Sequence, residues 1–508
     1  MEPSPGFTGR KQTALLLFSI LFFATAFATA QDWVHTGTNL GAQKIRLAAA
    51  DFKMVGNDAK LSSAQQVFNM VLYSDLTNAG IFDMVSKSLA PPVMPGSPQE
   101  INLSQWGSAP ANAAMVAFGA IKVQDNQVIV DGWLFDAKNT QSPQVLGLQY
   151  SEASTPDTAR HIAHEFADAI IARLGGGING IAESKIFYIS DRSGNKEVWE
   201  MDYDGANQHQ ITHISSICLS PRISPDGTRL AFDELNTRGG NIRIYSMSLH
   251  RMLNFPIHNG TDYSPAWAPD GNTLYVTAQD VLDHPVFKVD AKTGKVEKLK
   301  ATTDQWEGNI GDVTPLPGGA LLYSRNSIAD PTDLFVRDAK GKVTRLTEVN
   351  KAQMAEIDPV DVKRLQFAGA NGDTVWGQIV KPAKAEGKLP VAFLIHGGPQ
   401  SSFGNGWSTR WNPRLFSAPG YAAVTIDFHG STGYGQAFTD SINKDWGGKP
   451  LEDLKLGLAA AGKQDTSLDV TNACALGGSY GGYMTNWIAG QWPDGFKCLV
   501  QHDGVFDA

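Results

Sequence analysis

A serine embedded among glycines is the strongest chemical signal in this 508-residue chain. Residues 477–482 read GGSYGG, with an apolar run before them and a helix-like stretch after them. A sharp turn from strand to helix lifts a serine hydroxyl out of a sheet, and glycines flank it because side chains there would collide with neighbouring backbone. The pattern predicts a nucleophile elbow at Ser479, between a buried strand ending near Leu476 and a helix starting near Tyr480.

Apolar runs that end in glycine-rich loops predict the sheet that positions this serine. Residues 391–395 run into HGGP, residues 421–426 run into DFHG, and a third run from 473 leads to Ser479. Helical stretches such as 451–462 separate these runs. Continuous apolar strands of this kind are typical of a buried parallel sheet, in which ligands bind at the carboxyl ends of the strands.

A repeated pattern precedes this region. SPDG at 224–227 returns as APDG at 268–271, each followed by short apolar strands, of which 230–232, 274–276 and 321–323 are the clearest. A period of roughly 45 residues with several short strands in each unit is typical of β-propeller blades, and we count about four units.

The first region mixes helix and strand patterns without an obvious chemical site. Residues 44–52 predict a strand, residues 62–79 a helix, and residues 115–135 a hairpin that turns at 124–127. The clearest helix is expected after Thr155, which can act as its amino-terminal cap with Pro156 in the first turn. Its buried face would carry the apolar residues Ile162, Phe166, Ile170 and Leu174.

Composition and charge exclude several classes of protein. The chain is 42% hydrophobic and 18% charged, which is typical of globular proteins rather than disordered ones. Its formal net charge is −9 and it has no block rich in lysine and arginine, which argues against a nucleic-acid surface. The three cysteines, Cys218, Cys474 and Cys498, are odd in number and lack metal-type spacing, which favours small buried hydrophobes over a disulfide framework.

The amino terminus predicts export. Arg10 and Lys11 give a positive start, residues 14–27 are apolar, and residues 28–30 (ATA) form a small-residue cleavage site. We therefore expect a periplasmic or secreted protein without a membrane span in the mature chain, with a retained amino-terminal anchor as the alternative.

Four motifs between 396 and 483 resemble the catalytic domain of the prolyl oligopeptidase family of serine peptidases, especially its acylaminoacyl-peptidase and secreted dipeptidyl-peptidase branch. They are HGGP at 396–399, GSTGYG at 430–435, DWGG at 445–448 and GGSYGGY at 477–483. Residues 31–270 resemble TolB, the periplasmic protein of the Tol-Pal envelope system. That likeness rests on IFD at 81–83, GWLFD at 132–136 and SDRSG at 190–194.

The peptidase resemblance implies a role for each matched residue. Ser479 would be the acylated nucleophile, and the Tyr434 hydroxyl and the backbone N–H of Tyr480 would hold the oxyanion. The HGGP segment would shape the floor beside them, and neither a cofactor nor a metal is implied. One departure is Phe428-His429 before Gly430, where many relatives have Pro-Arg, which favours the dipeptidyl-peptidase-like subgroup.

The larger departure concerns the catalytic base. The family's aspartate and histidine are expected beyond residue 508, so we expect a truncated, C-terminally incomplete or hybrid chain that is inactive as it stands. His502 and Asp503 are close to Ser479 in sequence but are expected to follow the next strand, at 497–501, rather than to complete a triad. His396 and His429 are expected to have structural roles in their loops.

Together these patterns predict a multidomain chain. We expect a signal peptide at 1–30, a small TolB-like α/β domain at 31–178, propeller repeats at 179–357 and a partial α/β-hydrolase domain at 358–508. The predicted function is a serine peptidase that hydrolyses short peptides through an acyl-enzyme. The alternative is a non-enzymatic TolB-like scaffold that binds envelope proteins.

Overall fold

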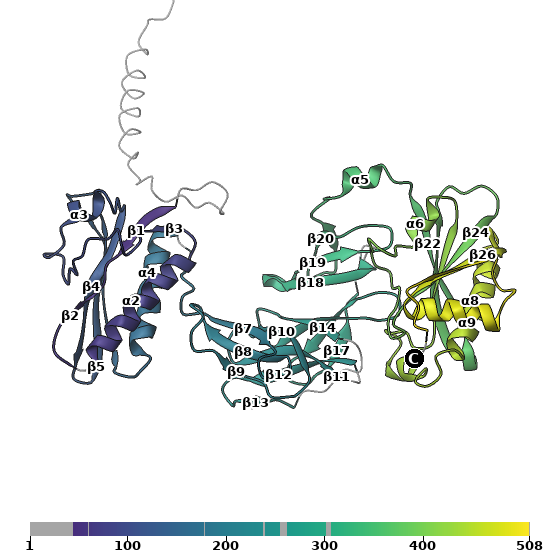
Figure 1. Ribbon diagram of the computed structural model, residues 1–508, viewed down its shortest axis with the longest axis horizontal. Coiled ribbons are helices and arrows are strands. Elements are labelled where there is room, and N and C mark those ends of the chain that lie inside the picture. Colours follow the sequence, from purple (N-terminus) through teal and green to yellow (C-terminus); the bar gives the residue numbers. More distant parts are fainter. Residues whose placement is uncertain are drawn as a thin grey trace, which may run out of the picture. The chain divides into compact units, whose positions relative to one another are not determined.

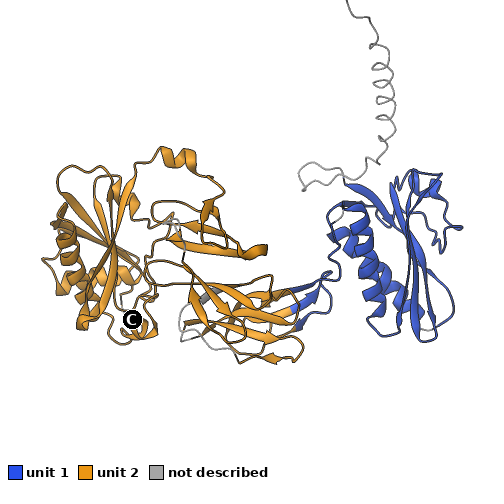
Figure 2. Cartoon of the chain, turned by 180° about the vertical axis from the view of Figure 1, so that it is seen from behind, with its two compact units in different colours: residues 1–186, 200–209 blue, residues 187–199, 210–508 orange. Residues whose placement is uncertain are grey.

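The computed structural model describes residues 44–58, 60–176, 178–236, 239–254, 262–300 and 306–506. The chain divides into two compact units, one of Met1–Ile186 with Glu200–His209 and one of Phe187–Trp199 with Gln210–Ala508 (Figure 2). The predicted signal segment at 1–30 lies outside the described residues. Among those that are described, every helix is too short or too polar to cross a membrane.

The first unit is built on a mixed sheet with helices on it. Its elements are β1 Ile45–Ala49, β2 Lys53–Met54, α2 Leu61–Asn78, β3 Phe82–Met84, α3 Leu103–Gly107, β4 Met115–Gln124, β5 Gln127–Asp136, β6 Gln144–Ala153 and α4 Thr158–Leu174. The strand order is β3-β1-β4-β5-β6, parallel at β3-β1-β4 and antiparallel from β4 to β6, and β2 pairs with β4. Helices α2 and α4 lie side by side on one face (Figure 1).

Most predictions for this unit are confirmed. The strand, the first helix and the hairpin are present, and the hairpin turns at Asp125 and Asn126, both with positive φ. The predicted cap of α4 is wrong. The helix begins at Thr158 rather than beside Thr155, because the Thr155 hydroxyl lies 2.8 Å from the Thr158 hydroxyl instead of capping a helical N–H. The predicted apolar face of α4 is buried, as expected.

Four successive small sheets follow, three of them antiparallel, which agrees with the predicted propeller repeats. Three have four strands, β10 to β13, β14 to β17 and β18 to β21, and one has three, β7 to β9. The bounds are β7 Lys185–Ser190, β8 Glu197–Asp202, β9 His209–Gln210, β10 Ile217–Ile223, β11 Arg229–Asn236, β12 Gly239–Ser246, β13 Arg251–Met252, β14 Asp262–Trp267, β15 Thr273–Ala278, β16 Val286–Asp290, β17 Val296–Lys298, β18 Asn309–Pro315, η2 Pro317–Gly319, β19 Leu321–Asn326, β20 Asp333–Arg337, β21 Val343–Arg345 and α5 Lys351–Ala355.

The last part of the second unit contains the predicted parallel sheet. Its elements are β22 Val360–Ala368, η3 Ala370–Gly372, β23 Thr374–Pro382, β24 Leu389–Ile395, α6 Arg414–Ser417, β25 Ala422–Asp427, α7 Gln436–Asp440, α8 Lys449–Gln464, β26 Leu468–Gly478, α9 Tyr480–Gln491 and β27 Cys498–His502. The order is β22-β23-β25-β24-β26-β27, and the last four strands are parallel. Strands β22 and β23 pair antiparallel at the other edge.

One face of this sheet packs against α8 and α9. Leu454 and Leu458 of α8 and Met484 and Ile488 of α9 share a buried core with strand residues such as Phe393. Burying a side chain of this size stabilises a fold by about 1.5–3 kcal/mol, so this core holds α8 and α9 against the sheet.

The cysteine prediction is wrong for two of the three residues. Cys474 on β26 and Cys498 on β27 are register partners on adjacent parallel strands, and they form a disulfide. The sequence could not indicate this bond, because sheet register rather than sequence spacing brings the two residues together. Cys218 is a free, buried cysteine, as expected.

Candidate active site

Ser479 lies on the predicted tight turn. Strand β26 ends at Gly478, α9 begins at Tyr480, and Ser479 between them has φ 56° and ψ −119°. A residue with a side chain rarely adopts a positive φ, and such strain persists only where the surroundings impose it. The strain identifies the elbow geometry that the glycine pattern predicts.

The flanking glycines are required by close backbone contacts. A Cβ added at Gly477 would collide with the backbone of Gly481, and one at Gly481 would collide with the carbonyl oxygen of Ile395. These neighbours are backbone atoms, which cannot move aside as a flexible side chain can. The glycines therefore let the start of α9 lie directly against the end of β24.

Backbone hydrogen bonds hold the serine on both sides, and the next N–H lies in the first turn of the helix. Ser479 donates its N–H to the carbonyl oxygen of His502 at 3.0 Å and accepts from the N–H of Tyr483 at 3.0 Å. The N–H of Tyr480 belongs to the first turn of α9, where backbone donors have no acceptor within the helix. The Tyr480 side chain is buried and donates its hydroxyl to the carbonyl oxygen of Trp446 at 2.6 Å. Tyr480 is thus anchored by its ring, while its N–H lies next to Ser479.

Ser479 opens into a cavity of about 460 Å³. Gly397 of the HGGP segment lies against it, since a Cβ there would come within 3.3 Å of the Ser479 Cβ. The cavity is also lined by Trp411, His502 and Asp503. The predicted position of HGGP beside the serine is confirmed.

The hydroxyl of Ser479 makes no hydrogen bond within the part of the chain that the structure describes. His502 lines the same cavity, but its Nδ1 lies 3.5 Å from a carboxylate oxygen of Asp503. His396 also lines the cavity, yet both of its ring nitrogens are occupied, at 2.8 Å from the Gly397 carbonyl oxygen and 2.8 Å from the Ser431 hydroxyl. Burial lowers the pKa of His396, so its ring is neutral near pH 7.

Tyr434 is held by a buried carboxylate. Its hydroxyl donates to Oδ2 of Asp427 at 2.8 Å, and Asp427 ends β25. The same oxygen accepts from the Ser402 hydroxyl, and Oδ1 accepts from the N–H of Phe403 at 3.2 Å. Burial raises the pKa of Asp427, and burial and then this carboxylate raise the pKa of Tyr434. We name the side chains of Asp427, Tyr434 and Ser402 the Asp427 network.

Tyr434 and Ser479 line different cavities. Tyr434 lines a separate cavity of about 750 Å³, together with Gln279, Trp376 and His429. The Asp427 network connects the two cavities, because Ser402 lines the one that contains Ser479. The closeness of the Tyr434 hydroxyl to Ser479 stays a prediction, as do the catalytic roles of Ser479, Tyr434 and Tyr480.

His429 has the structural role expected of it, in a pairing that the sequence did not reveal. Its Nδ1 lies 2.6 Å from Oδ2 of buried Asp453, and its Nε2 lies 3.2 Å from Oδ2 of Asp373. Burial lowers the pKa of His429, but the bonds to the two carboxylates outweigh it and the net pKa is raised. The ring also stacks on Phe438 at 4.4 Å between centroids.

Four family models match successive parts of the chain. They are the TolB amino-terminal domain at residues 38–142, the TolB beta propeller domain at 173–359, Acetyl xylan esterase (AXE1) at 338–448 and the Prolyl oligopeptidase family at 407–508. These matches confirm the resemblance to both TolB and the peptidase family.

Curated relatives and a solved structure are similar to parts of the chain. Dipeptidyl-peptidase 5 of Schizosaccharomyces pombe is 33% identical over 329 residues, which cover 61% of this chain and 46% of the relative. Dipeptidyl-peptidase 5 of Aspergillus fumigatus is 34% identical over 303 residues, which cover 57% of this chain and 42% of the relative. The chain thus spans less than half the length of these curated relatives. TolB from Acinetobacter baumannii has a similar fold, with a TM-score of 0.50 at 19% identity over 69% of this chain and 86% of that one.

The elbow at Ser479 and the parallel sheet that presents it are consistent with the family models that match the chain. The chain carries a TolB-like amino-terminal domain and propeller, followed by a region at 407–508 that matches the Prolyl oligopeptidase family.

Proposed function

We propose that the protein is a serine peptidase that cleaves short peptides through an acyl-enzyme at Ser479. The serine oxygen attacks the carbonyl carbon of the scissile bond, the amine leaves with a proton, and water then hydrolyses the ester. The N–H of Tyr480 and the hydroxyl of Tyr434 would stabilise the oxyanion of each tetrahedral intermediate.

The strained elbow is the observation that carries this proposal. Ser479 keeps a positive φ, a free hydroxyl and an adjacent helix N–H at the carboxyl end of a parallel strand. A serine with only a structural role would not need a backbone conformation that costs on the order of 1–3 kcal/mol.

The Asp427 network gives Tyr434 two states in this proposal. A phenolic hydroxyl has one proton, so it donates either to Asp427 or to a substrate oxyanion. The structure has the first of these arrangements, with donation to Asp427 at 2.8 Å. Bound substrate would draw the hydroxyl away from the carboxylate, and apo catalytic hydrogen bonds commonly rearrange in this way.

Turnover by this 508-residue chain is expected to be low. Within the described residues no base is hydrogen-bonded to the Ser479 hydroxyl, and an unassisted serine is a weak nucleophile. A site that lacks its triad partners retains about 10³–10⁴-fold catalysis over water at best.

The relatives named dipeptidyl-peptidase support short peptides as the substrate class. Export to the periplasm or the medium is part of the proposal, and the disulfide between Cys474 and Cys498 supports it, since disulfides persist in oxidising compartments. We retain the proposed boundaries of 31–178, 179–357 and 358–508 for the three folded domains.

A TolB-like scaffold that binds envelope proteins is the second candidate. It is favoured by the TolB amino-terminal and propeller models, which match residues 38–142 and 173–359. In that case the Ser479 turn would be retained without catalysis.

A fluorophosphonate probe distinguishes the two candidates, because it reports the reactivity of a serine hydroxyl without requiring turnover of a substrate. We expect slow, stoichiometric labelling of the full chain at Ser479, mapped by peptide mass spectrometry, and none in Ser479→Ala. Ser408→Ala is the matched control, since Ser408 lines the same cavity away from the turn. Labelling equal to that of the unfolded chain would refute the peptidase proposal. Robust turnover of dipeptidyl chromogenic substrates, lost in Ser479→Ala, would refute the expectation of low activity.

A further inference from the structure

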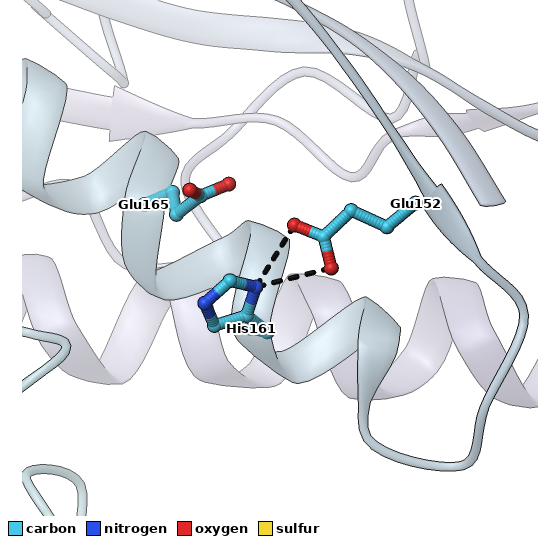
Figure 3. A group of neighbouring side chains, drawn as sticks. All are labelled: Glu152, His161 and Glu165. Atoms are coloured by element: carbon cyan, nitrogen blue, oxygen red, sulfur yellow. Dashed lines mark hydrogen bonds and ion pairs between the residues drawn. The ribbon is translucent and has the colours of Figure 1, made fainter.

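Two histidines of α4 lie among carboxylates in the first unit, but their ring nitrogens differ in availability. Nδ1 of His161 lies 2.9 and 3.1 Å from the two carboxylate oxygens of Glu152 (Figure 3). Its Nε2 lies 3.3 Å from a carboxylate oxygen of Glu183. The imidazole is half exposed, with Glu165 one turn further along the helix. Both nitrogens of His161 are already paired, so this exposed group offers no free nitrogen ligand.

His164 is the opposite case. Its side chain is only 7% exposed, and its Nδ1 lies 2.7 Å from Oδ2 of Asp75 on α2. Its Nε2 is buried and has no hydrogen-bond partner in the described part of the chain. A buried nitrogen that is left unpaired calls for an explanation, because nearly all buried polar groups in proteins are satisfied.

Two further carboxylates lie close to the His164 ring. Asp202 ends β8 and Asp204 lies in the turn that follows. His164, Asp202 and Asp204 each offer a ligand atom, and these atoms all lie within 4.8 Å of one another. All of these residues belong to the first unit, so the cluster does not depend on how the two units are placed.

The hydrogen bond to Asp75 prepares His164 for coordination. When Nδ1–H donates to a carboxylate, the imidazole is fixed in the tautomer whose Nε2 carries the lone pair. A carboxylate behind a histidine also makes that nitrogen a better ligand, and this arrangement recurs around protein-bound metals. Asp75 is completely buried, so its effect on the ring is not weakened by water.

Asp202 and Asp204 are each paired with a basic side chain, which a bound metal ion would have to displace or share the carboxylate with. Lys185 forms an ion pair with Oδ1 of Asp202, and Asn207 donates to Oδ2 at 2.7 Å. Arg160 forms an ion pair with Oδ2 of Asp204. The Lys185 side chain is half exposed and can turn to solvent, while Arg160 is mostly buried and can stay on one oxygen of Asp204.

We propose that His164, Asp202 and Asp204 bind one divalent transition-metal ion, and that Asp75 orients His164 from behind. One imidazole and two carboxylates suit zinc, and a fourth position remains for water. Tetrahedral ligands about 2.0–2.2 Å from zinc lie about 3.3–3.6 Å apart, and the three ligand atoms here already lie within 4.8 Å of one another. Bound metal would join α4 to the end of β8.

Zinc titration of the untagged, metal-stripped full chain tests this site. Isothermal titration with zinc chloride is expected to show one equivalent bound, and cobalt substitution should give visible d–d absorption. His164→Gln should abolish both signals, and Asp75→Asn should weaken binding by about 10–100-fold. Lys185→Ala should tighten binding by roughly 2–5-fold, because the metal no longer displaces an ammonium group.

His161→Gln is the matched control, since it changes a histidine of the same helix in the exposed group and should leave binding unchanged. The proposal is overturned if the wild-type chain binds no zinc, or if binding is lost in His161→Gln and kept in His164→Gln. If circular dichroism shows that His164→Gln is unfolded, the zinc affinities of Asp75→Asn and Lys185→Ala test the site instead. Unchanged zinc affinity in both Asp75→Asn and Lys185→Ala would then refute the site.

Discussion

The Ser479 turn and the Asp427 network lie at the carboxyl ends of strands in one sheet, but different forces hold them in place. Backbone contacts hold Ser479, because Gly477 and Gly481 admit neighbouring backbone where a Cβ would collide. Side-chain hydrogen bonds hold Tyr434, through buried Asp427. We conclude that the first site is sensitive to added volume, and the second to charge and therefore to pH.

The largest expected effect is that of Gly481→Ala. The added methyl group would collide with backbone atoms at the end of β24, which cannot move without shifting the sheet. We expect a loss of about 3 kcal/mol in the free energy of unfolding, measured by urea denaturation, and no labelling of Ser479.

Gly490→Ala is the matched control on the same helix. A Cβ there would meet nothing within 4 Å, and alanine favours helix over glycine by up to about 1 kcal/mol. Equal stability of the two alanine variants would contradict the view that backbone space shapes the turn.

The next effect concerns His429, which is held between two carboxylates. His429→Gln removes the ring bonded to Asp453 and should cost about 1–3 kcal/mol, since a buried acceptor loses its donor. Because the folded pKa of His429 is raised, its stabilising contribution is complete below the unfolded pKa of about 6.5 and is lost as pH rises through the folded pKa. The cost of the substitution should therefore be greater at pH 6 than at alkaline pH.

His213→Gln is the control for this pH dependence, because His213 is exposed. We expect a difference from wild type within about 0.5 kcal/mol at every pH, as for most surface substitutions. If the free energy of unfolding of His429→Gln changed with pH in the same way as that of the wild type, the charged ring would not stabilise the fold.

Features encoded in one stretch of sequence were predictable, and features assembled from several stretches were not. Residues 477–482 contain the serine, the glycines and the start of the helix, so the elbow could be inferred from them alone. The bond between Cys474 and Cys498 depends on the register of two strands, and the Asp427 network joins Ser402 to the later stretch that carries Asp427 and Tyr434. Helix α4 starts late because a hydroxyl pair forms instead of a cap, and propensity does not distinguish these two outcomes.

Asp427→Asn tests the charge dependence of the network. Burial raises the pKa of Asp427, so the protonated acid is the form that the fold favours. Its contribution to stability is complete below the unfolded pKa of about 3.9 and is lost as pH rises through the folded pKa. Relative to wild type, the asparagine variant should gain stability as pH rises, measured by urea denaturation at several pH values.

Asp440→Asn is the control, since Asp440 is exposed on α7 and accepts a hydrogen bond from Gln436 at 2.9 Å. Its stability relative to wild type should change little across the same range. If the stability of Asp427→Asn relative to wild type were also independent of pH, the negative charge of Asp427 would not be what destabilises the fold.

The smallest expected effect separates the strain at Ser479 from its chemistry. Ser479→Ala removes the hydroxyl but keeps the Cβ that makes φ 56° unfavourable, whereas Ser479→Gly removes both. Glycine usually destabilises a protein relative to alanine, but at a positive φ the order reverses. We expect the free energy of unfolding of the glycine variant to be about 1 kcal/mol higher than that of the alanine variant. Neither variant should react with the fluorophosphonate. An alanine variant as stable as the glycine variant would mean that the turn carries no strain, and the argument that function maintains this conformation would fail with it.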